Sequence, residues 1–91
     1  NIYKTRKWQR LRGRALRRDE YICRECKRYG RTAQATTVHH IYPVEQYPEW
    51  KWATWNMLSL CDACHNKMHN RETGELSELG KQWTDRVSPP P

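Results

Sequence analysis

Two pairs of cysteines place the tightest constraint on how this chain can fold. Cys23 and Cys26 form one CxxC pair, and Cys61 and Cys64 form a second pair farther along. Two widely separated pairs predict a tetrahedral zinc site in which each pair supplies two thiolates. The alternative is a disulfide framework, which needs an oxidising compartment. Because neither a signal peptide nor an apolar run of membrane length is visible, we expect structural zinc and a cytoplasmic protein.

A structural metal ion is expected in a chain of this size and composition. The 91 residues are 36% hydrophobic and include no phenylalanine, so we expect one domain with a thin core. Domains this small usually need disulfides or a structural metal. We predict a small α+β domain stapled by zinc. Its expected parts are a basic N-terminal helix (1–20), a core with both cysteine pairs (21–71) and a C-terminal helix with a proline-rich tail (72–91).

Positive charge is concentrated in the first third of the chain. The formal net charge is +7; residues 1–31 carry twelve Lys or Arg and three Asp or Glu, whereas residues 32–91 carry five and seven. A basic segment ahead of a near-neutral body predicts a polyanion-binding surface, and nucleic acid is the partner we expect. Binding to a membrane surface would call for a large apolar helix face that is not evident.

The basic segment is predicted to be a helix over residues 4–20. It contains no proline, and Trp8, Leu11 and Ala15 recur at spacings of three and four on one apolar stripe. Gly13 weakens the expectation of an unbroken helix. A run of charge is usually a solvated face, but the single sign here favours contact with phosphates. Four arginines share the roughly opposite face: Arg6, Arg10, Arg14 and Arg17.

Two short strands and a loop are predicted next. β-Branched residues favour a strand over residues 36–41, which Pro43 ends. A second short strand is expected over residues 57–60, leading into the second cysteine pair. Residues 44–55 show no clear period and are expected to form an ordered loop. Its tryptophans are expected to cover the core, with base stacking as the alternative.

A helix is predicted to start at Asp62, as its N-cap, and to run through His69. His65 and His69 lie four residues apart, so on such a helix both imidazoles would project from one face and could bind one metal ion. Taken alone, the pair could equally be chance surface histidines. A last helix is predicted over residues 75–86.

His39 and His40 are adjacent on the first predicted strand. Their side chains therefore face opposite sides or diverge, and the two residues cannot share one task. One can bind a metal ion while the other stays free to accept a proton. Imidazole titrates near pH ~6.5, which suits a general base close to neutrality.

Together these residues resemble a known family. His40-Ile41-x-Pro43, then Asn56, then Leu60-Cys61-x-x-Cys64-His65-x-x-x-His69 is similar to the HNH nucleases of the ββα-metal fold. Relatives of this kind include small phage HNH endonucleases, the colicin DNases and the HNH domains of CRISPR effectors. The resemblance runs from Cys23 to about Arg71, roughly half of the chain, and it makes residues 21–71 the expected nuclease core.

The resemblance implies a role for each residue of the motif. His39 would bind the catalytic divalent cation, with His65 as second ligand and His69 as an additional ligand found only in the histidine-rich members. His40 would be the general base that activates water, and Asn56 would hold the loop that orients His40. The cysteines would bind the structural zinc. Relatives typically work with Mg²⁺ or Mn²⁺; imidazole ligands favour Mn²⁺ or Ni²⁺ over Mg²⁺, and zinc could occupy the site and inhibit.

The function implied is metal-dependent hydrolysis of phosphodiester bonds in double-stranded DNA, by nicking or cutting, with 5′-phosphate and 3′-hydroxyl products. Lys67 and Arg71 are candidates for phosphate contact, or simply surface charge. Phage-type relatives often act with the DNA-packaging terminase, which is therefore the protein partner implied; a monomer without membrane contact is expected. The principal alternative is a non-catalytic zinc module that binds DNA. A restriction or homing HNH nuclease would share the chemistry and differ in target.

Overall fold

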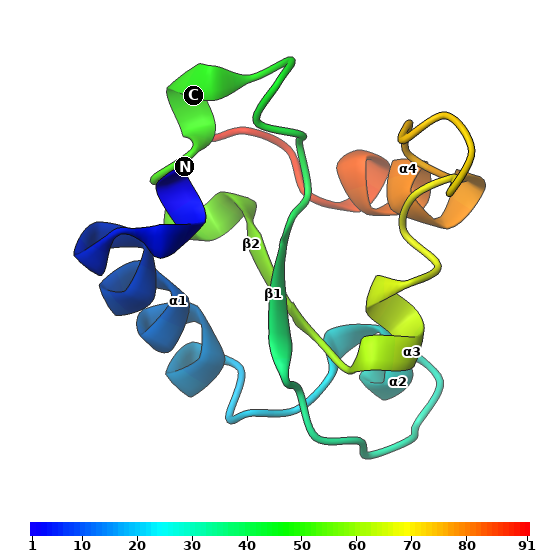
Figure 1. Ribbon diagram of the computed structural model, residues 1–91. Helices are drawn as coiled ribbons and strands as arrows, with labels where there is room; N and C mark the ends of the chain where they lie inside the picture. Colours follow the sequence, from blue (N-terminus) through cyan, green and yellow to red (C-terminus); the bar gives the residue numbers. More distant parts are fainter.

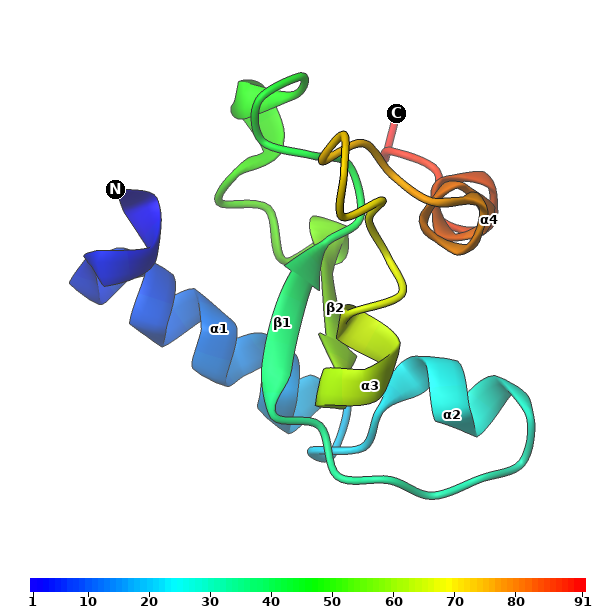
Figure 2. The ribbon, with the colours of Figure 1, turned by 45° about the vertical axis from the view of Figure 1, so that its right-hand side comes forward.

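A computed structural model describes residues 1–91. Two antiparallel strands, β1 (Thr37–His40) and β2 (Met57–Leu60), form a small sheet at the centre of the molecule. Helix α1 (Arg6–Arg18) lies on one side of this hairpin, and three shorter helices lie on the other side (Figures 1 and 2). The predicted α+β architecture is confirmed. The shorter helices are α2 (Arg24–Arg28), α3 (Asp62–His65) and α4 (Glu78–Arg86), and single 3₁₀ turns occur at Ile2–Lys4, Pro48–Trp50 and Thr54–Asn56.

The hairpin separates two small apolar clusters. In its register His39 pairs with Leu58 and His40 with Met57. Because side chains alternate along a strand, Val38 and Met57 face α1, whereas Leu58 faces the shorter helices. The α1 cluster contains Trp8, Leu11, Ala15, Leu16, Ala35, Val38 and Met57. The opposite cluster contains Cys23, Ile41, Leu58, Leu60, Cys64, Met68 and Trp83.

Helix α1 is close to the predicted helix and is fixed at both ends. Thr5 caps its start, since its hydroxyl accepts a hydrogen bond from the backbone N–H of Trp8. Gly13 lies inside the helix without interrupting it. At the other end the Arg18 guanidinium donates to the Met57 carbonyl (2.7 Å) and to the Asp19 carboxylate (2.8 Å). These bonds tie the end of α1 to the beginning of β2.

The helix predicted from Asp62 through His69 is wrong at both ends. The N-cap position is Cys61, and Asp62 is the first helical residue. The Asp62 carboxylate instead accepts a hydrogen bond from the Thr36 hydroxyl (2.7 Å). The helix ends at His65: the next N–H groups, of Lys67 and Met68, donate to carbonyls only three residues back, and the Met68 carbonyl accepts from the backbone N–H of Ser77 (2.9 Å).

Helix α4 also starts later than predicted, at Glu78, behind an N-cap at Ser77. A buried hydrogen bond joins it to α2: the Trp83 indole N–H donates to the Glu25 carboxylate (3.1 Å), which also accepts from Arg28 (2.8 Å). None of the helices is long and apolar enough to span a membrane.

The loop between the strands is ordered by its aromatic side chains, as predicted. The Tyr47 and Trp50 rings stack with centroids 4.9 Å apart, and Tyr42 meets both edge-on. Trp52 packs against the α1 cluster. These contacts hold the loop that follows His40 against the body of the protein.

Candidate active site and cysteine metal site

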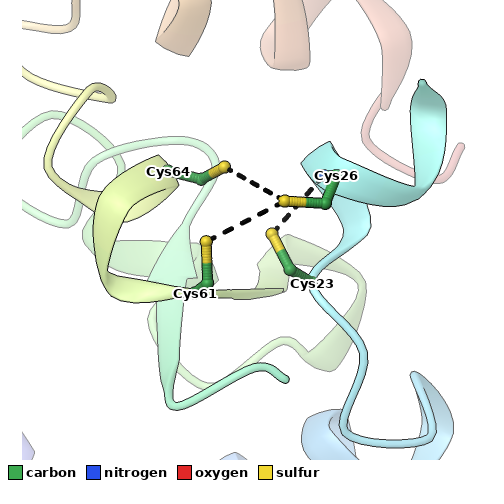
Figure 3. Close-up of side chains that lie close together, drawn as sticks. All are labelled: Cys23, Cys26, Cys61 and Cys64. Carbon is green, nitrogen blue, oxygen red and sulfur yellow. Dashed lines mark hydrogen bonds between the residues drawn. The ribbon is translucent and has the colours of Figure 1, made fainter. Parts of the chain in front are cut away.

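The four cysteines converge between α2 and α3 (Figure 3). All four sulfur atoms lie within 4.8 Å of one another; Cys26 Sγ is 4.0 Å from Cys61 Sγ and 3.7 Å from Cys64 Sγ. Each pair uses the same local structure, in which the first cysteine is the helix N-cap and the second lies in the first turn. The sequence prediction that these side chains share one tetrahedral site is supported by this geometry.

The chemistry of the four thiols suits a bound cation. A hydrogen bond from the Cys64 backbone N–H lowers the pKa of Cys61, whereas burial raises the pKa of both Cys26 and Cys64. Thiols that resist ionisation when buried are stabilised as thiolates by a metal ion. The group can therefore hold one metal ion between the two halves of the chain.

His39, His65 and His69 come together on the other side of β1 from α1. The His39 ring centroid lies 6.1 Å from that of His65 and 5.3 Å from that of His69. The His39 Nε2 atom is buried and has no hydrogen-bond partner. An orphaned imidazole nitrogen facing two other imidazoles is the arrangement expected of a metal ligand. The three rings are not gathered as closely as the cysteine sulfur atoms.

Two histidines of this group, His39 and His69, are held in the neutral form that binds metal. Burial, reinforced by the nearby His69 and His65 rings, lowers the pKa of His39 to about 3. Burial and the His65 ring also lower the pKa of His69. Neutral imidazoles can offer a nitrogen lone pair at neutral pH without first losing a proton.

His40 faces α1, away from that group, as the alternation of the strand predicts. Its ring lies 5.0 Å from the Trp8 ring. His40 Nε2 is 3.0 Å from the Lys51 carbonyl oxygen, and Nδ1 is 3.3 Å from the Tyr3 hydroxyl. Because a carbonyl can only accept, Nε2 carries the hydrogen, and the lone pair is on Nδ1, where Tyr3 donates. Burial lowers the pKa of His40, so the ring is neutral near pH 7.

Asn56 is fully buried and holds two points of the loop that follows His40. Its side-chain oxygen accepts from the Tyr42 backbone N–H (2.7 Å), and its amide donates to the carbonyls of Tyr42 (3.1 Å) and Trp50 (3.3 Å). It does not touch the His40 ring directly. It fixes the backbone next to His40 and next to Lys51, whose carbonyl orients the imidazole.

A single cleft of about 430 Å³ joins these groups along the free edge of β1. Both histidine positions of β1 reach it, although they face opposite sides of the hairpin. Tyr3, Arg12 and Glu45 are among the residues of this cleft that were not predicted from the sequence. The residues that line it are Tyr3, Trp8, Arg12, Thr37, Val38, His39, His40, Pro43, Val44, Glu45, His65, His69 and Gly74.

The basic residues proposed from the sequence lie outside this cleft. Lys67 and Arg71 are exposed, and neither lines the cleft. The four predicted arginines of α1 are likewise exposed on its outer face: Arg6, Arg10, Arg14 and Arg17. They can contact a polyanion beside the cleft but not a group inside it.

His69 is placed by α4 rather than by a helix of its own. It forms a β-bridge with Leu76, just ahead of the Ser77 cap, whose backbone N–H donates to the Met68 carbonyl. Gly80 makes this approach possible, because a Cβ there would overlap the Met68 carbonyl oxygen and lie 2.9 Å from Leu76 Cδ2.

Gly80→Ala should therefore destabilise the fold by about 1–3 kcal/mol, the usual cost of overpacking, despite the better helix propensity of alanine. Urea unfolding measures the difference. Gly13→Ala is the matched control, since a Cβ there meets only the flexible end of Arg17 (3.1 Å), and it should stabilise the protein by up to ~1 kcal/mol. Equal stabilities of the two variants would contradict the packing argument.

Comparison with known proteins agrees with this geometry. The family model described as HNH endonuclease matches residues 23–71, more than half of the chain. The crystal structure of the HNH endonuclease of deep-sea thermophilic bacteriophage GVE2 with manganese ion is similar, with a TM-score of 0.69 and 35% sequence identity over 71% of each chain. No curated protein matches the sequence. The residues of the motif, the ββα arrangement and these two matches show that the chain belongs to the HNH endonuclease family.

Proposed function

We propose that the chain hydrolyses phosphodiester bonds of double-stranded DNA with His40 as general base and one divalent cation bound by His39, His65 and His69. The observation that carries this is the cleft along β1, which is lined by His40, by Tyr3, whose hydroxyl donates to His40 Nδ1, and by the three histidines of the proposed cation site. A divalent cation held by these imidazoles supplies positive charge that stabilises the phosphate and the leaving oxygen.

His40 acts through Nδ1. A water molecule that replaces the Tyr3 hydroxyl there can give its proton to the imidazole as it attacks phosphorus. The Lys51 carbonyl, which accepts from Nε2–H, holds the ring in the reactive tautomer and stabilises the imidazolium that forms. Asn56 keeps the Lys51 carbonyl in place through its bond to the preceding residue, Trp50, and it holds the chain just after His40 through its bonds to Tyr42. Products with a 5′-phosphate and a 3′-hydroxyl follow from the resemblance to the family.

The donor set favours a one-cation mechanism and manganese or nickel over magnesium. Imidazole nitrogen suits Mn²⁺ and Ni²⁺ better than Mg²⁺, and the similar bacteriophage enzyme was crystallised with manganese ion. Glu45 is the one carboxylate that lines the cleft, so a carboxylate pair that could bridge two cations is lacking there. The cysteine site takes zinc, the usual partner of four thiolates.

The basic N-terminal helix (residues 1–20) holds the DNA backbone beside the nuclease core (21–71). Its outer arginines, with Lys67 and Arg71, provide exposed positive charge without sequence-reading groups, which favours modest sequence specificity. Free cysteine thiols suit the reducing cytoplasm of a host cell. A role with a phage terminase in DNA packaging follows by analogy with phage-type relatives.

Incubating supercoiled plasmid with the zinc-loaded protein tests this function. We expect relaxed or linear DNA with Mn²⁺, Ni²⁺ or Mg²⁺ and intact DNA with EDTA at a concentration that leaves the cysteine site loaded. Sequencing the ends distinguishes dispersed cleavage from the single target of a restriction or homing enzyme. A protein that binds the plasmid but leaves it intact with every cation would instead be the non-catalytic DNA-binding module.

A further inference from the structure

Arg12 occupies a position on α1 where an arginine is unexpected. It follows Trp8 by four residues and precedes Leu16 by four, so it lies on the face of the helix that these two buried residues share. The other arginines predicted to bind DNA point away from this face. Arg12 is half-buried there, whereas the other arginines of α1 are exposed, so its charge is partly desolvated and calls for compensation by a partner.

The surroundings of Arg12 provide only part of that compensation. Its Nη2 donates to the Thr36 carbonyl oxygen (2.9 Å), and it makes no ion pair with any carboxylate. Arg18 and Arg28 differ, since each is paired with an acidic side chain at 2.8 Å. Arg12 is therefore anchored by one neutral bond and retains its full charge without a counter-ion.

Arg12 also lines the cleft along β1, together with His39 and His40. A guanidinium has five N–H groups, so four remain beyond the bond to Thr36, in the planar arrangement that fits two oxygens of a phosphate. We propose that Arg12 is a catalytic residue that binds the non-bridging oxygens of the scissile phosphate and stabilises the charge that develops on them. This assignment rests on the proposed function.

Arg12 and the arginines of the outer face should differ in whether their alanine variants change kcat or DNA affinity. Arg12→Ala should lower kcat about 10²–10³-fold with little change in DNA affinity, as loss of a donor to the developing charge does. Arg14→Ala, two residues away and exposed, gives the contrast: it should weaken DNA binding and reduce its salt dependence. Lys81→Ala is the control, because it removes an exposed cation of α4 that does not line the cleft, and it should leave kcat and DNA affinity unchanged.

Bis(p-nitrophenyl) phosphate makes the distinction sharper, because this small diester has a scissile phosphate but no flanking DNA. With Mn²⁺, Arg12→Ala should show the full loss on it, Lys81→Ala should match the wild type, and added guanidinium at millimolar concentration should restore part of the Arg12→Ala rate. A purely structural role for Arg12 would not produce rescue. Zinc content and melting temperature are measured alongside, and Arg12→Gln, whose amide can still donate to Thr36, carries the test if Arg12→Ala does not fold.

Two results would overturn the assignment, and they differ. A wild type that cleaves both substrates, with Arg12→Ala and Arg12→Gln within twofold of it, would remove Arg12 from the chemistry and leave the proposed function standing. A wild type inert on both substrates with every cation would overturn the proposed function and this assignment with it.

Discussion

Replacing His40 with alanine should lower DNA cleavage by about 10²–10⁴-fold, the range over which general bases contribute. The variant loses the one imidazole of the cleft whose Nε2–H donates to a backbone carbonyl, so that Nδ1, now facing the Tyr3 hydroxyl, keeps its lone pair for a proton. The other imidazole of β1, His39, faces the opposite side of the hairpin and cannot replace it. Single-turnover cleavage of plasmid with saturating Mn²⁺ measures the chemical step without product release.

A second pair of variants separates loss of the base from loss of the cation. His40→Gln fills more of the same space beside Trp8 but accepts no proton near neutral pH, so it should be as inactive as His40→Ala while it folds. His39→Ala should also be inactive, but through weaker Mn²⁺ binding, which electron paramagnetic resonance of free Mn²⁺ reports. His40→Ala with normal Mn²⁺ binding and cleavage within tenfold of the wild type would exclude His40 as the base.

Local patterns predicted the parts of this fold that depend on nearby residues. The apolar stripe of Trp8, Leu11 and Ala15 predicted α1, and the buried residues of α1 include all three. The second strand was predicted at its exact bounds, Met57–Leu60, from its place just before the second cysteine pair, and all four of its residues are buried. CxxC spacing places the two sulfur atoms of a pair on one side of a turn whatever surrounds it. Two such pairs therefore predicted one shared four-cysteine site, and the four sulfur atoms do converge.

The predictions failed where contacts distant in sequence decide the structure. The spacing of His65 and His69 suggested one helix, but the helix ends at His65, and Ser77 binds the carbonyls of Lys67 and Met68 in the segment that follows. His69 still comes near His39, by a β-bridge that no local pattern encodes.

The same reason explains why Arg12 was missed as a cleft residue. The charge of the basic segment drew attention to the outer face of α1, whereas the informative signal was an arginine placed between Trp8 and Leu16. Its position on the inner face could be read from the helical period, but the cleft that it faces exists only after α1 packs against β1.

Removing the metal from the cysteine site should unfold the core, whereas removing the catalytic cation should not. Cys23 and Cys64 are themselves buried members of the apolar cluster next to the shorter helices, and they join the segment before β1 to the segment after β2. That cluster is small, with only seven buried residues. Binding of a structural zinc contributes about 10–16 kcal/mol, which is comparable to or larger than the whole stability of a typical domain at about 5–15 kcal/mol.

Cys64→Ser should therefore abolish the cooperative thermal transition seen by circular dichroism, and zinc analysis should fall from one ion per chain to none. Brief treatment with EDTA should strip the histidine site and stop cleavage while the melting curve and the zinc content stay unchanged; a strong zinc chelator should remove both. His65→Ala is the matched control, because it lies one residue from Cys64 in the same helix but belongs to the histidine group, so it should keep zinc and folding while Mn²⁺ binding weakens. A zinc-free protein that melts like the wild type would show that the apolar clusters alone stabilise the fold. The cysteine site would then not be a structural metal site.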